Sequence, residues 1–423
     1  MSAAQTAATA AAAETLCSEV SRLAAEHGDG SLGSRVDLHR VWVFRDRVVV
    51  LDYLVHGGAV AFDVIPDEGG DEWRLVVHAR HSVDRPQVAA LGLPPAARPD
   101  RFRVGSPIRA ADDTQRASLA DVVLSRCRGV LDKLTAVGPA PQTSRLLDAL
   151  GVSDPLVVVD VGANPLELPA YTRLLGMGVC RVVGFEPQPE AFARLQGRDP
   201  QREQYFPHAI GSPGQHQLRI YEGSGFASTF AIDETSIDFI ANERWRDGTR
   251  LRETIDLELT ALDDVPDLPA FDLLKIDVQG GELAVFESGR RSLSSALCVI
   301  PEVSFFPLYD GAPSFADVHQ ELVAQGFALH KFMFQKSVHL HGSQSGEESV
   351  RASRSQLVDG DAVYLRDLRG LADFSSVQVA KLVLLATYVF DSPDLAVRGL
   401  DELVRRGEVS KKVVKQYVGQ RYV

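Results

Sequence analysis

The sequence is poor in cysteine and has no long hydrophobic run. Its 423 residues include four cysteines, none of them in a Cys-x-x-Cys pair: Cys17, Cys127, Cys180 and Cys298. Thiols scattered in this way exclude a disulfide framework and a structural zinc site, and they are typical of a reducing compartment. No stretch approaches the roughly 18 apolar residues of a membrane span. The alanine-rich N-terminus is interrupted by Glu14 and Glu19 and lacks the basic start of a signal peptide. We therefore expect a cytoplasmic protein with no transmembrane segment.

Positive charge is also scarce. The formal net charge is −13 at pH 7, with 44 Lys and Arg against 57 Asp and Glu. A surface that binds a phosphate backbone needs clustered Lys and Arg, so we expect no nucleic-acid partner. The chain is longer than the roughly 250 to 300 residues at which single cores stop growing, which predicts at least two compact units.

Glycine-rich phosphate loops are missing as well. The turn after the apolar run 157–161 contains Gly162 alone, where a dinucleotide-binding fold has Gly-x-Gly-x-x-Gly. A nucleoside triphosphate loop is absent, and so is the Tyr-x-x-x-Lys pair of many oxidoreductases. An NAD-dependent sugar oxidoreductase is therefore a less favoured alternative.

Three apolar, β-branched runs are present, and each stops at an acid or a glycine. They lie at 157–162, 182–186 and 273–277. This pattern is typical of parallel strands that are buried on both faces and whose carboxyl ends meet a ligand. Asp160 and Glu186 are separated by one strand, helix, strand unit, so Glu186 is placed to bind the diol of a ribose. A nucleoside cofactor without phosphate, such as S-adenosylmethionine, fits this arrangement.

The sequence resembles the FkbM-type S-adenosylmethionine-dependent methyltransferases. The matching blocks are 160–164, 184–190, 272–282, 302–305, 307–309 and 361–367, and the resemblance covers roughly residues 150 to 370. Two features depart from the family's pattern, Pro165-Leu166 after the first turn and Gln279 in place of a glutamate. These departures keep open the alternative of a non-catalytic binding or scaffold protein that retains the fold.

The resemblance and the strand pattern together predict the fold and the activity. We expect a doubly wound, seven-stranded Rossmann-like α/β sheet, because strand-like and helix-like segments alternate along 150–370. The resemblance implies S-adenosylmethionine as cofactor and O-methylation of a hydroxyl in a sugar-containing acceptor, such as a polysaccharide, glycolipid or natural product. The predicted cofactor-binding residues are Asp160, Gly162, Asn164, Glu186, Ala209 and Ile210.

Two acids are the candidate catalytic residues. Asp277 follows a predicted strand and is placed to accept the proton of the acceptor hydroxyl. Its alternative role is to cap the helix expected near Gly281. Glu302 lies in an otherwise apolar strand, where a carboxylate is costly to bury unless it is paired, and Lys275 is the expected counter-ion. We predict no metal site.

Changes in composition and hydrophobic pattern along the sequence predict four segments. These are a tail and helix at 1–30, a small α+β N-terminal domain at 31–138, the methyltransferase domain at 150–370, and a helical C-terminal extension at 371–423. Residues 138–141 (Gly-Pro-Ala-Pro) are the expected linker, and the weakly periodic stretch 223–252 is a candidate substrate flap. The N-terminal domain could bind the rest of a glycan, form a homodimer or contact a glycosyltransferase partner.

Overall fold

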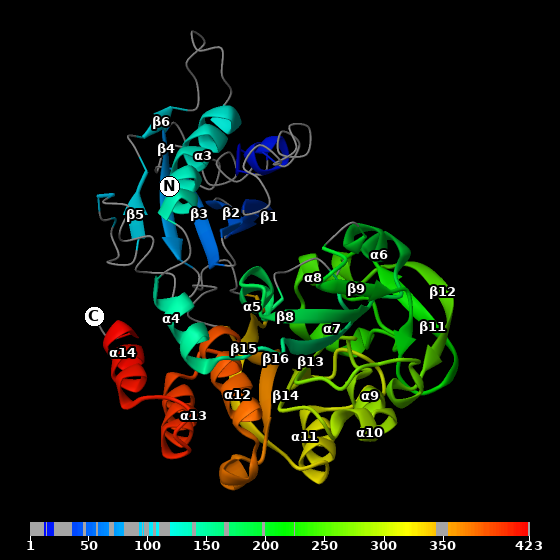
Figure 1. Ribbon diagram of the computed structural model, residues 1–423. Coiled ribbons are helices and arrows are strands. Elements are labelled where there is room, and N and C mark those ends of the chain that lie inside the picture. Colours follow the sequence, from blue (N-terminus) through cyan, green and yellow to red (C-terminus); the bar gives the residue numbers. More distant parts are fainter. Residues whose placement is uncertain are drawn as a thin grey trace. The chain divides into compact units, whose positions relative to one another are not determined.

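Figure 1 shows the computed structural model of the chain, which folds as two compact units. The residues that it describes are 12–13, 15–20, 36–44, 48–55, 58–66, 72–79, 93–94, 96, 101–104, 107–109, 119–137, 141–164, 169–196, 199–223, 225–343 and 354–421. The expected linker residues 138–140 and the departure at Pro165-Leu166 lie outside these ranges. One unit comprises 1–152, 167–177 and 403–423, and the other comprises 153–166 and 178–402.

The first unit is built on an antiparallel sheet in the order β1-β2-β3-β4-β5, with β6 paired to β4. The strands are β1 (Val36–Phe44), β2 (Val48–Val55), β3 (Gly58–Pro66), β4 (Glu72–Ala79), β5 (Arg101–Arg103) and β6 (Ile108–Arg109). Alternate side chains such as Phe62 and Trp73 pack on helix α3 (Leu119–Val137) through Val123 and Leu131. The unit also contains α4 (Pro141–Leu150), α5 (Thr172–Gly176) and α14 (Lys411–Arg421).

The second unit contains a seven-stranded sheet in the order β15-β16-β14-β13-β7-β8-β9. Its strands are β7 (Leu156–Val161), β8 (Cys180–Phe185), β9 (Glu203–Phe206), β13 (Leu273–Ile276), β14 (Cys298–Ser304), β15 (Phe327–His339) and β16 (Arg354–Arg366). Pairing is parallel from β14 to β9, whereas β16 runs antiparallel to both of its neighbours. The predicted doubly wound, seven-stranded α/β sheet is confirmed; the reversal of β16 was not predicted.

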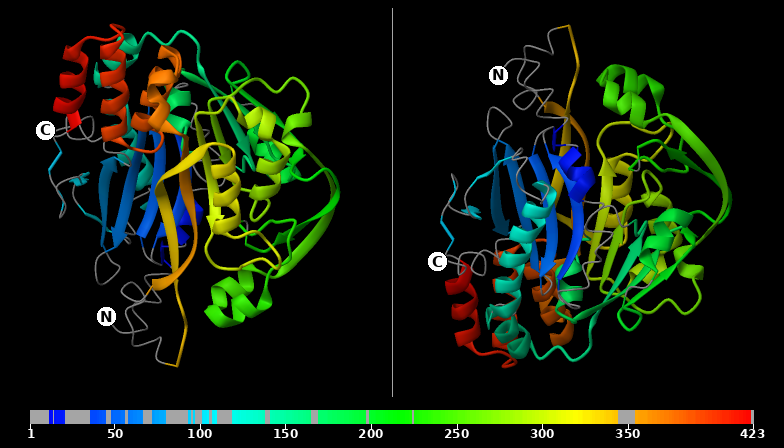
Figure 2. Two further views of the ribbon diagram at one scale, coloured as in Figure 1. Left: turned by 90° about the horizontal axis from the view of Figure 1, so that it is seen from below. Right: turned by 90° about the horizontal axis from the view of Figure 1, so that it is seen from above.

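Burial explains why the apolar runs form the centre of this sheet. All six residues of β7 are buried, and so are three of the four in β13. One face packs on α9 (Glu282–Ser288), α10 (Arg290–Leu293) and α11 (Phe315–Ala324) through Phe286, Leu293 and Leu322. At the sheet's edge, β15 and β16 form a long ribbon, yellow to orange in Figure 2.

A smaller three-stranded sheet is formed by residues that lie between β9 and β13 in the chain. It has the order β10-β12-β11, with β10 (Ala209–Ile210), β11 (Gly214–Tyr221) and β12 (Leu251–Thr260). The stretch that we expected to be weakly periodic carries two short helices, α7 (Glu234–Ile240) and α8 (Glu243–Gly248). Asp233 and Asn242 cap these helices by accepting hydrogen bonds from the backbone N–H groups of Thr235 and Trp245.

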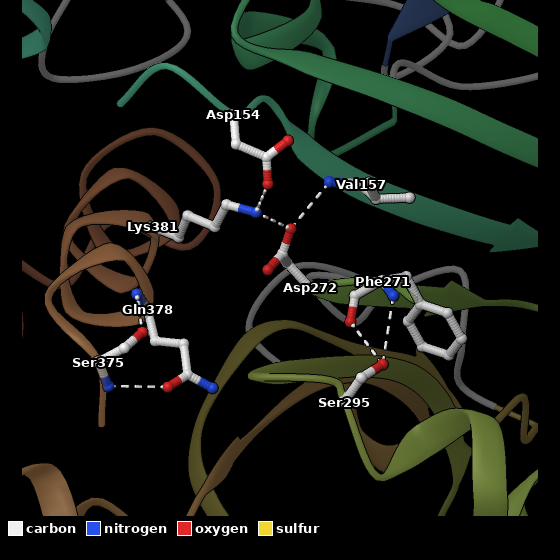
Figure 3. Close-up of polar contacts among 8 residues, drawn as sticks. All are labelled: Asp154, Val157, Phe271, Asp272, Ser295, Ser375, Gln378 and Lys381. Atoms are coloured by element: carbon white, nitrogen blue, oxygen red, sulfur yellow. Dashed lines mark hydrogen bonds and ion pairs between the residues drawn. The ribbon is translucent and has the colours of Figure 1, made fainter. Parts of the chain in front are cut away.

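The helices α12 (Ser376–Tyr388) and α13 (Pro393–Arg405) come between β16 and α14 in the chain. Lys381 of α12 is buried and reaches the amino ends of β7 and β13, where its Nζ lies 2.9 Å from Asp272 and 3.2 Å from Asp154 (Figure 3). The Asp272 carboxylate also accepts a hydrogen bond from the N–H of Val157. This network attaches α12 to the sheet. Among the described helices, none is long and apolar enough to cross a membrane.

Candidate active site

The predicted site residues meet at the carboxyl edge of the central sheet. β7 carries Asp160, β8 leads into Glu186, and β13 leads into Asp277. Asp160 is directly opposite Gly184 on one side and Lys275 on the other. The negative charges of Asp160 and Asp277 both raise the pKa of Glu186, so the three carboxylates lie within electrostatic reach of one another. The structure therefore brings together residues that are more than a hundred positions apart.

Gly162 is required by the crossing of two loops at this edge. Its φ is +77°, a conformation that favours glycine, and a Cβ added there would overlap the backbone carbonyl of Asp277. The loop after β7 and the loop after β13 therefore touch through bare backbone. This contact holds the turn after β7, which is predicted to bind the cofactor, against Asp277, the candidate catalytic base.

Glu186 and Asn164 offer acceptors suited to a nucleoside cofactor. Glu186 is buried, and burial, followed by the charges of Asp160 and Asp277, raises its pKa to about 7 even though the N–H of Gln188 donates to its Oε1 at 2.8 Å. The buried Oδ1 of Asn164 has no hydrogen-bond partner among the described residues. Ribose hydroxyls and an ammonium group are donors, so such a ligand would satisfy both side chains. The residues present fit S-adenosylmethionine.

Ala209 and Ile210 form β10, which begins three residues after β9 ends. Both are buried, and the N–H of Glu186 donates to the carbonyl of Phe206 at the end of β9. The Phe206 ring stacks between Phe185 and the imidazole of His208. An apolar surface thus continues from the strand that leads to Glu186.

Asp277 and Glu302 form a hydrogen-bonded carboxyl pair close to the residues that are predicted to bind the cofactor. Burial, and then the negative charge of Asp277, raise the pKa of Glu302 well above its ordinary value. Burial would also raise the pKa of Asp277, but the positive charge of Lys275 and hydrogen bonds from Glu302 and Gln279 keep it below its ordinary value. Two carboxyl groups in contact share a proton rather than both ionising. The raised pKa of Glu302 and the lowered pKa of Asp277 favour the proton on Glu302.

Gln279 lies at the centre of this pair. Its Nε2 donates to Asp277 Oδ1 at 2.8 Å and also to Glu302 Oε2, while its Oε1 accepts from the hydroxyl of Tyr309 at 2.9 Å. The sequence showed Gln279 only as a departure from the family's pattern. Its contacts join positions 23 and 30 residues away, and no local pattern reveals such contacts.

The alternative role of Asp277 as a helix cap is wrong. Helix α9 begins at Glu282 with Gly281 at its N-cap, and no side chain caps it. Glu282 instead folds back, and its two carboxylate oxygens accept from the N–H groups of Val278 and Gly280 at 2.9 and 3.0 Å. Burial raises the pKa of Glu282 to about 7. Glu282 therefore shapes the loop that carries Asp277.

Lys275 serves several carboxylates rather than Glu302 alone. Burial would lower its pKa, but the charges of Asp277, Asp361, Asp160 and Glu302, in decreasing order, raise it above the ordinary value. Its closest acid is Asp361, at 3.9 Å from Nζ. The predicted counter-ion role for Glu302 is thus one part of a wider role, in which Lys275 holds the acidic edge together.

Three of these acids are spaced as cation ligands would be. Among the described residues, oxygens of Asp277, Glu282 and Glu302 lie within 4.8 Å of one another. However, the oxygens of Glu282 accept backbone hydrogen bonds, and the Gln279 amide donates to the other two acids. A cation would have to displace these donors.

Comparisons with known proteins identify the domain that bears this site. Residues 160–329 match the family model described as Methyltransferase FkbM domain. A search of curated proteins gave no match.

Three solved structures illustrate the similarity. A methyltransferase FkbM from Methylobacillus flagellatus KT is 15% identical over 57% of this chain and 54% of that chain, with a TM-score of 0.27. Magnesium protoporphyrin IX methyltransferase from Synechocystis PCC 6803, with bound SAM, is 10% identical over 53% and 78%, with a TM-score of 0.27. A putative tRNA (m1A22) methyltransferase from Streptococcus pneumoniae, in complex with S-adenosyl-L-methionine, is 14% identical over 65% and 98%, with a TM-score of 0.26.

The family match agrees with the sheet order, the glycine at the loop crossing and the buried acids at the carboxyl edge. It also separates this chain from the nicotinamide-dependent oxidoreductases that were the less favoured alternative. Residues 160–329 are a methyltransferase FkbM domain, and the chain is an S-adenosylmethionine-dependent methyltransferase.

Proposed function

We propose that this chain methylates a hydroxyl oxygen of a sugar-containing acceptor, such as a polysaccharide, glycolipid or natural product, with Asp277 as the general base. The observation that supports the proposal is the position of Asp277: it is bridged to Glu302 by the Gln279 amide, and its backbone carbonyl meets Gly162 of the turn predicted to bind the cofactor. The cofactor supplies the methyl group. Asp160, Gly162, Asn164, Glu186, Ala209 and Ile210 are proposed to hold it.

The protonation states of the pair suit this chemistry. A hydroxyl oxygen becomes strongly acidic as its bond to the methyl carbon forms, so even a carboxylate of low pKa can accept the proton at that stage. Asp277 therefore needs correct placement more than high basicity. Glu302, held neutral, can donate to Asp277 and orient it without adding a second negative charge at the edge.

The acceptor would enter beside the segment that contains α7 and α8. Trp245 of α8 contacts the Phe226 ring edge-on, and the ammonium group of Lys336 lies 5.0 Å from the centre of the Trp245 ring. Aromatic rings and polar groups side by side suit stacking on a sugar face with hydrogen bonds to its hydroxyls. Phe305, another aromatic in this region, packs instead on Phe315 and Phe332 in the core.

The N-terminal unit is the part of the chain that we propose to bind the remainder of a glycan. Homodimer formation and attachment to a glycosyltransferase are the other partnerships that a glycan-modifying enzyme would use. We also propose a cytoplasmic location, because Cys127, Cys180 and Cys298 are buried thiols that form no disulfide.

The proposal is tested first by calorimetric titration of the full chain with S-adenosylmethionine, S-adenosylhomocysteine, NAD and NADP. Binding of the first two alone is expected. S-adenosylhomocysteine release is then followed with panels of sugars and glycolipids, and release with a hydroxyl-bearing sugar is the expected result. Cofactor binding without release for any acceptor in the panels would favour the scaffold alternative.

A pair of variants then tests the assignment of the base. Asp277→Asn should lower turnover by about a hundredfold, the low end of the contribution of general base catalysis. The control is Asp317, an exposed residue in the capping box of α11. Asp317→Asn should leave turnover unchanged. Full turnover in Asp277→Asn would show that Asp277 is not the base.

A further inference from the structure

Gln279 has a backbone conformation that needs an explanation. Its φ is +53°, in the left-handed region that residues other than glycine rarely adopt, and Gly280 follows with a φ of +105°. The side chain of Ser228, which is 1% exposed, donates to the Gln279 carbonyl at 2.6 Å. Strain of this kind persists only where surrounding contacts hold it, and it concentrates at functional sites. The strained backbone turns the Gln279 amide toward the two acids.

We propose that Gln279 is a positioning residue whose Nε2 bridges Asp277 and Glu302, holds the two carboxyl groups in place and stabilises their negative charge. This inference rests on the proposed function, in which Asp277 is the base. In this role, the uncharged amide of Gln279 bridges the two carboxyl groups as a bound cation would.

The contacts of Gln279 fix the orientation of its amide. The hydroxyl of Tyr309 donates to Oε1, and burial raises the pKa of that hydroxyl, which keeps it protonated. With Oε1 facing Tyr309, both N–H groups of Nε2 must face the acids. The flipped amide would place an oxygen against two carboxyl groups. The weaker second contact of Tyr309, 3.3 Å to the carbonyl of Phe226, leaves this assignment unchanged.

The charges around the pair show why a neutral bridge matters. Its negative neighbours are Glu186 after β8, Glu282 from α9 and Asp359 from β16, and its positive neighbours are Lys275 from β13 and Lys336 from β15. Ionisation of Glu302 would therefore add charge to a site already rich in carboxylates. A glutamate at position 279 would add one more, whereas the amide stabilises Asp277 as an anion and supplies no charge of its own.

The bridge also connects the base to the acceptor side. Ser228 and Ile232 lie in the segment that precedes α7, and Ile232 forms an isolated β-bridge with Tyr309. The hydroxyl groups of Ser228 and Tyr309 hold the backbone carbonyl and the side-chain carbonyl of Gln279, respectively. Movement of the segment that contains Ser228 would thus be transmitted to the Asp277 carboxylate through one residue.

Infrared titration of the full chain tests the proposal without an acceptor. The carboxylic acid C=O band of Glu302 is identified by its loss in Glu302→Gln, and its disappearance is followed as the pH is raised. Gln279→Met keeps the length of the side chain and removes both donors, so the pair should release its proton about one to two pH units higher than in the wild type. Gln279→Glu should move the titration in the same direction.

Two further variants keep the test decisive. Gln279→Asn retains a residue that tolerates the left-handed backbone but is one methylene too short to bridge, so it should behave as Gln279→Met. Gln325→Met is the matched control, because Gln325 also donates from Nε2 to a carboxylate, that of Glu321, away from the site. It should leave the titration of Glu302 unchanged.

The outcomes separate this inference from the proposed function. An unmoved titration in folded Gln279→Met and Gln279→Asn would overturn the bridging role, and so would a wild-type Glu302 acid band that disappears where an ordinary glutamate ionises. Wild-type turnover in Asp277→Asn, with the expected infrared shifts intact, would instead overturn only the role of Asp277 as base. Tightened Mg²⁺ binding by Gln279→Glu, measured by calorimetry, would further support the view that the amide replaces a cation.

Discussion

The two edges of the central sheet use buried charge in opposite ways. At the amino edge, Lys381 lies between Asp272 and Asp154, and each acid is within 3.2 Å of its ammonium group (Figure 3). At the carboxyl edge, Asp277 and Glu302 contact each other, and Lys275 lies 3.9 Å from its closest acid. One edge is electrostatically matched, and the other retains an excess of carboxyl groups.

This difference separates residues that stabilise the fold from residues that serve the reaction. The acids of the amino edge are matched by a cation or by N–H donors, so removing one partner leaves an uncompensated charge. The raised pKa values of Glu186, Glu282 and Glu302 show that ionising the carboxyl edge opposes folding. Buried carboxyl groups that reduce stability in this way are typical of sites that bind or transform a ligand.

Removing the buried lysine should produce the largest loss of stability. Lys381→Met strands the Asp272 carboxylate, whose side chain is 13% exposed, and should lower the free energy of unfolding by about 3 kcal/mol. Denaturant unfolding measures this loss, and calorimetry should show unchanged S-adenosylmethionine affinity in the folded protein. Arg369→Met, which breaks an exposed ion pair with Asp367, should change stability little. Equal losses in the two variants would remove the distinction between buried and exposed pairs.

The buried acids of the carboxyl edge should make the protein less stable as the pH rises, whereas a salt-bridged acid makes a protein more stable as the pH rises. The folded pKa of Glu186 is raised from 4.5 to about 7, so the folded state binds more protons than the unfolded state between these values. Stability must therefore fall as the pH rises through this window. Glu186→Gln should remove about 2 to 3 kcal/mol of that fall, measured by unfolding at several pH values. An unchanged slope would place Glu186 in a more hydrated environment than its burial indicates.

Substitutions at the carboxyl edge of the sheet should also lower the affinity for the cofactor. Glu186→Ala removes a carboxylate proposed to accept hydrogen bonds from the ribose, and it should weaken S-adenosylmethionine binding about tenfold, or about 1.4 kcal/mol. Titration calorimetry measures the change. Glu203→Ala, which removes an acid at the start of β9, at the other end of the sheet from the proposed ribose site, is the matched control and should bind as the wild type does. Wild-type affinity in Glu186→Ala would move the ribose site elsewhere.

The smallest effect is expected from a neutral hydrogen-bonding group at the amino edge. The Ser295 hydroxyl bonds to both the N–H and the carbonyl of Phe271, at 3.2 Å each (Figure 3). Ser295→Ala should cost about 1 kcal/mol of stability and leave cofactor binding unchanged. A loss as large as that of Lys381→Met would mean that hydrogen bonds, rather than charge pairing, dominate at this edge.

The sequence was sufficient for the strands and for the acids that end them. Runs such as 157–161 and 273–276 are apolar because both faces of the strand are covered, and this pattern is local. The end of each run then located Glu186 and Asp277. The reversal of β16 and the sheet formed by β10, β11 and β12 depend on pairing between distant segments, which leaves no periodic signature.

Interactions within the site were harder to predict than its members. Lys381 occupies one position in an almost wholly buried helix, and its partner Asp272 is 109 residues away. Gln279 was visible in the sequence as an unusual residue before two glycines, but its role depends on Tyr309 and Glu302. Residue type indicated which groups were available, whereas tertiary contacts decided their charge states.

Trp245, which lies 5.0 Å beneath the ammonium group of Lys336, also provides an optical probe. The chain has three tryptophans, and the other two, Trp42 and Trp73, belong to the N-terminal unit. Indole emission responds to a cation that approaches or leaves its ring. A change in fluorescence when candidate sugars are added would therefore report entry of a molecule next to α8, even for acceptors that are not methylated.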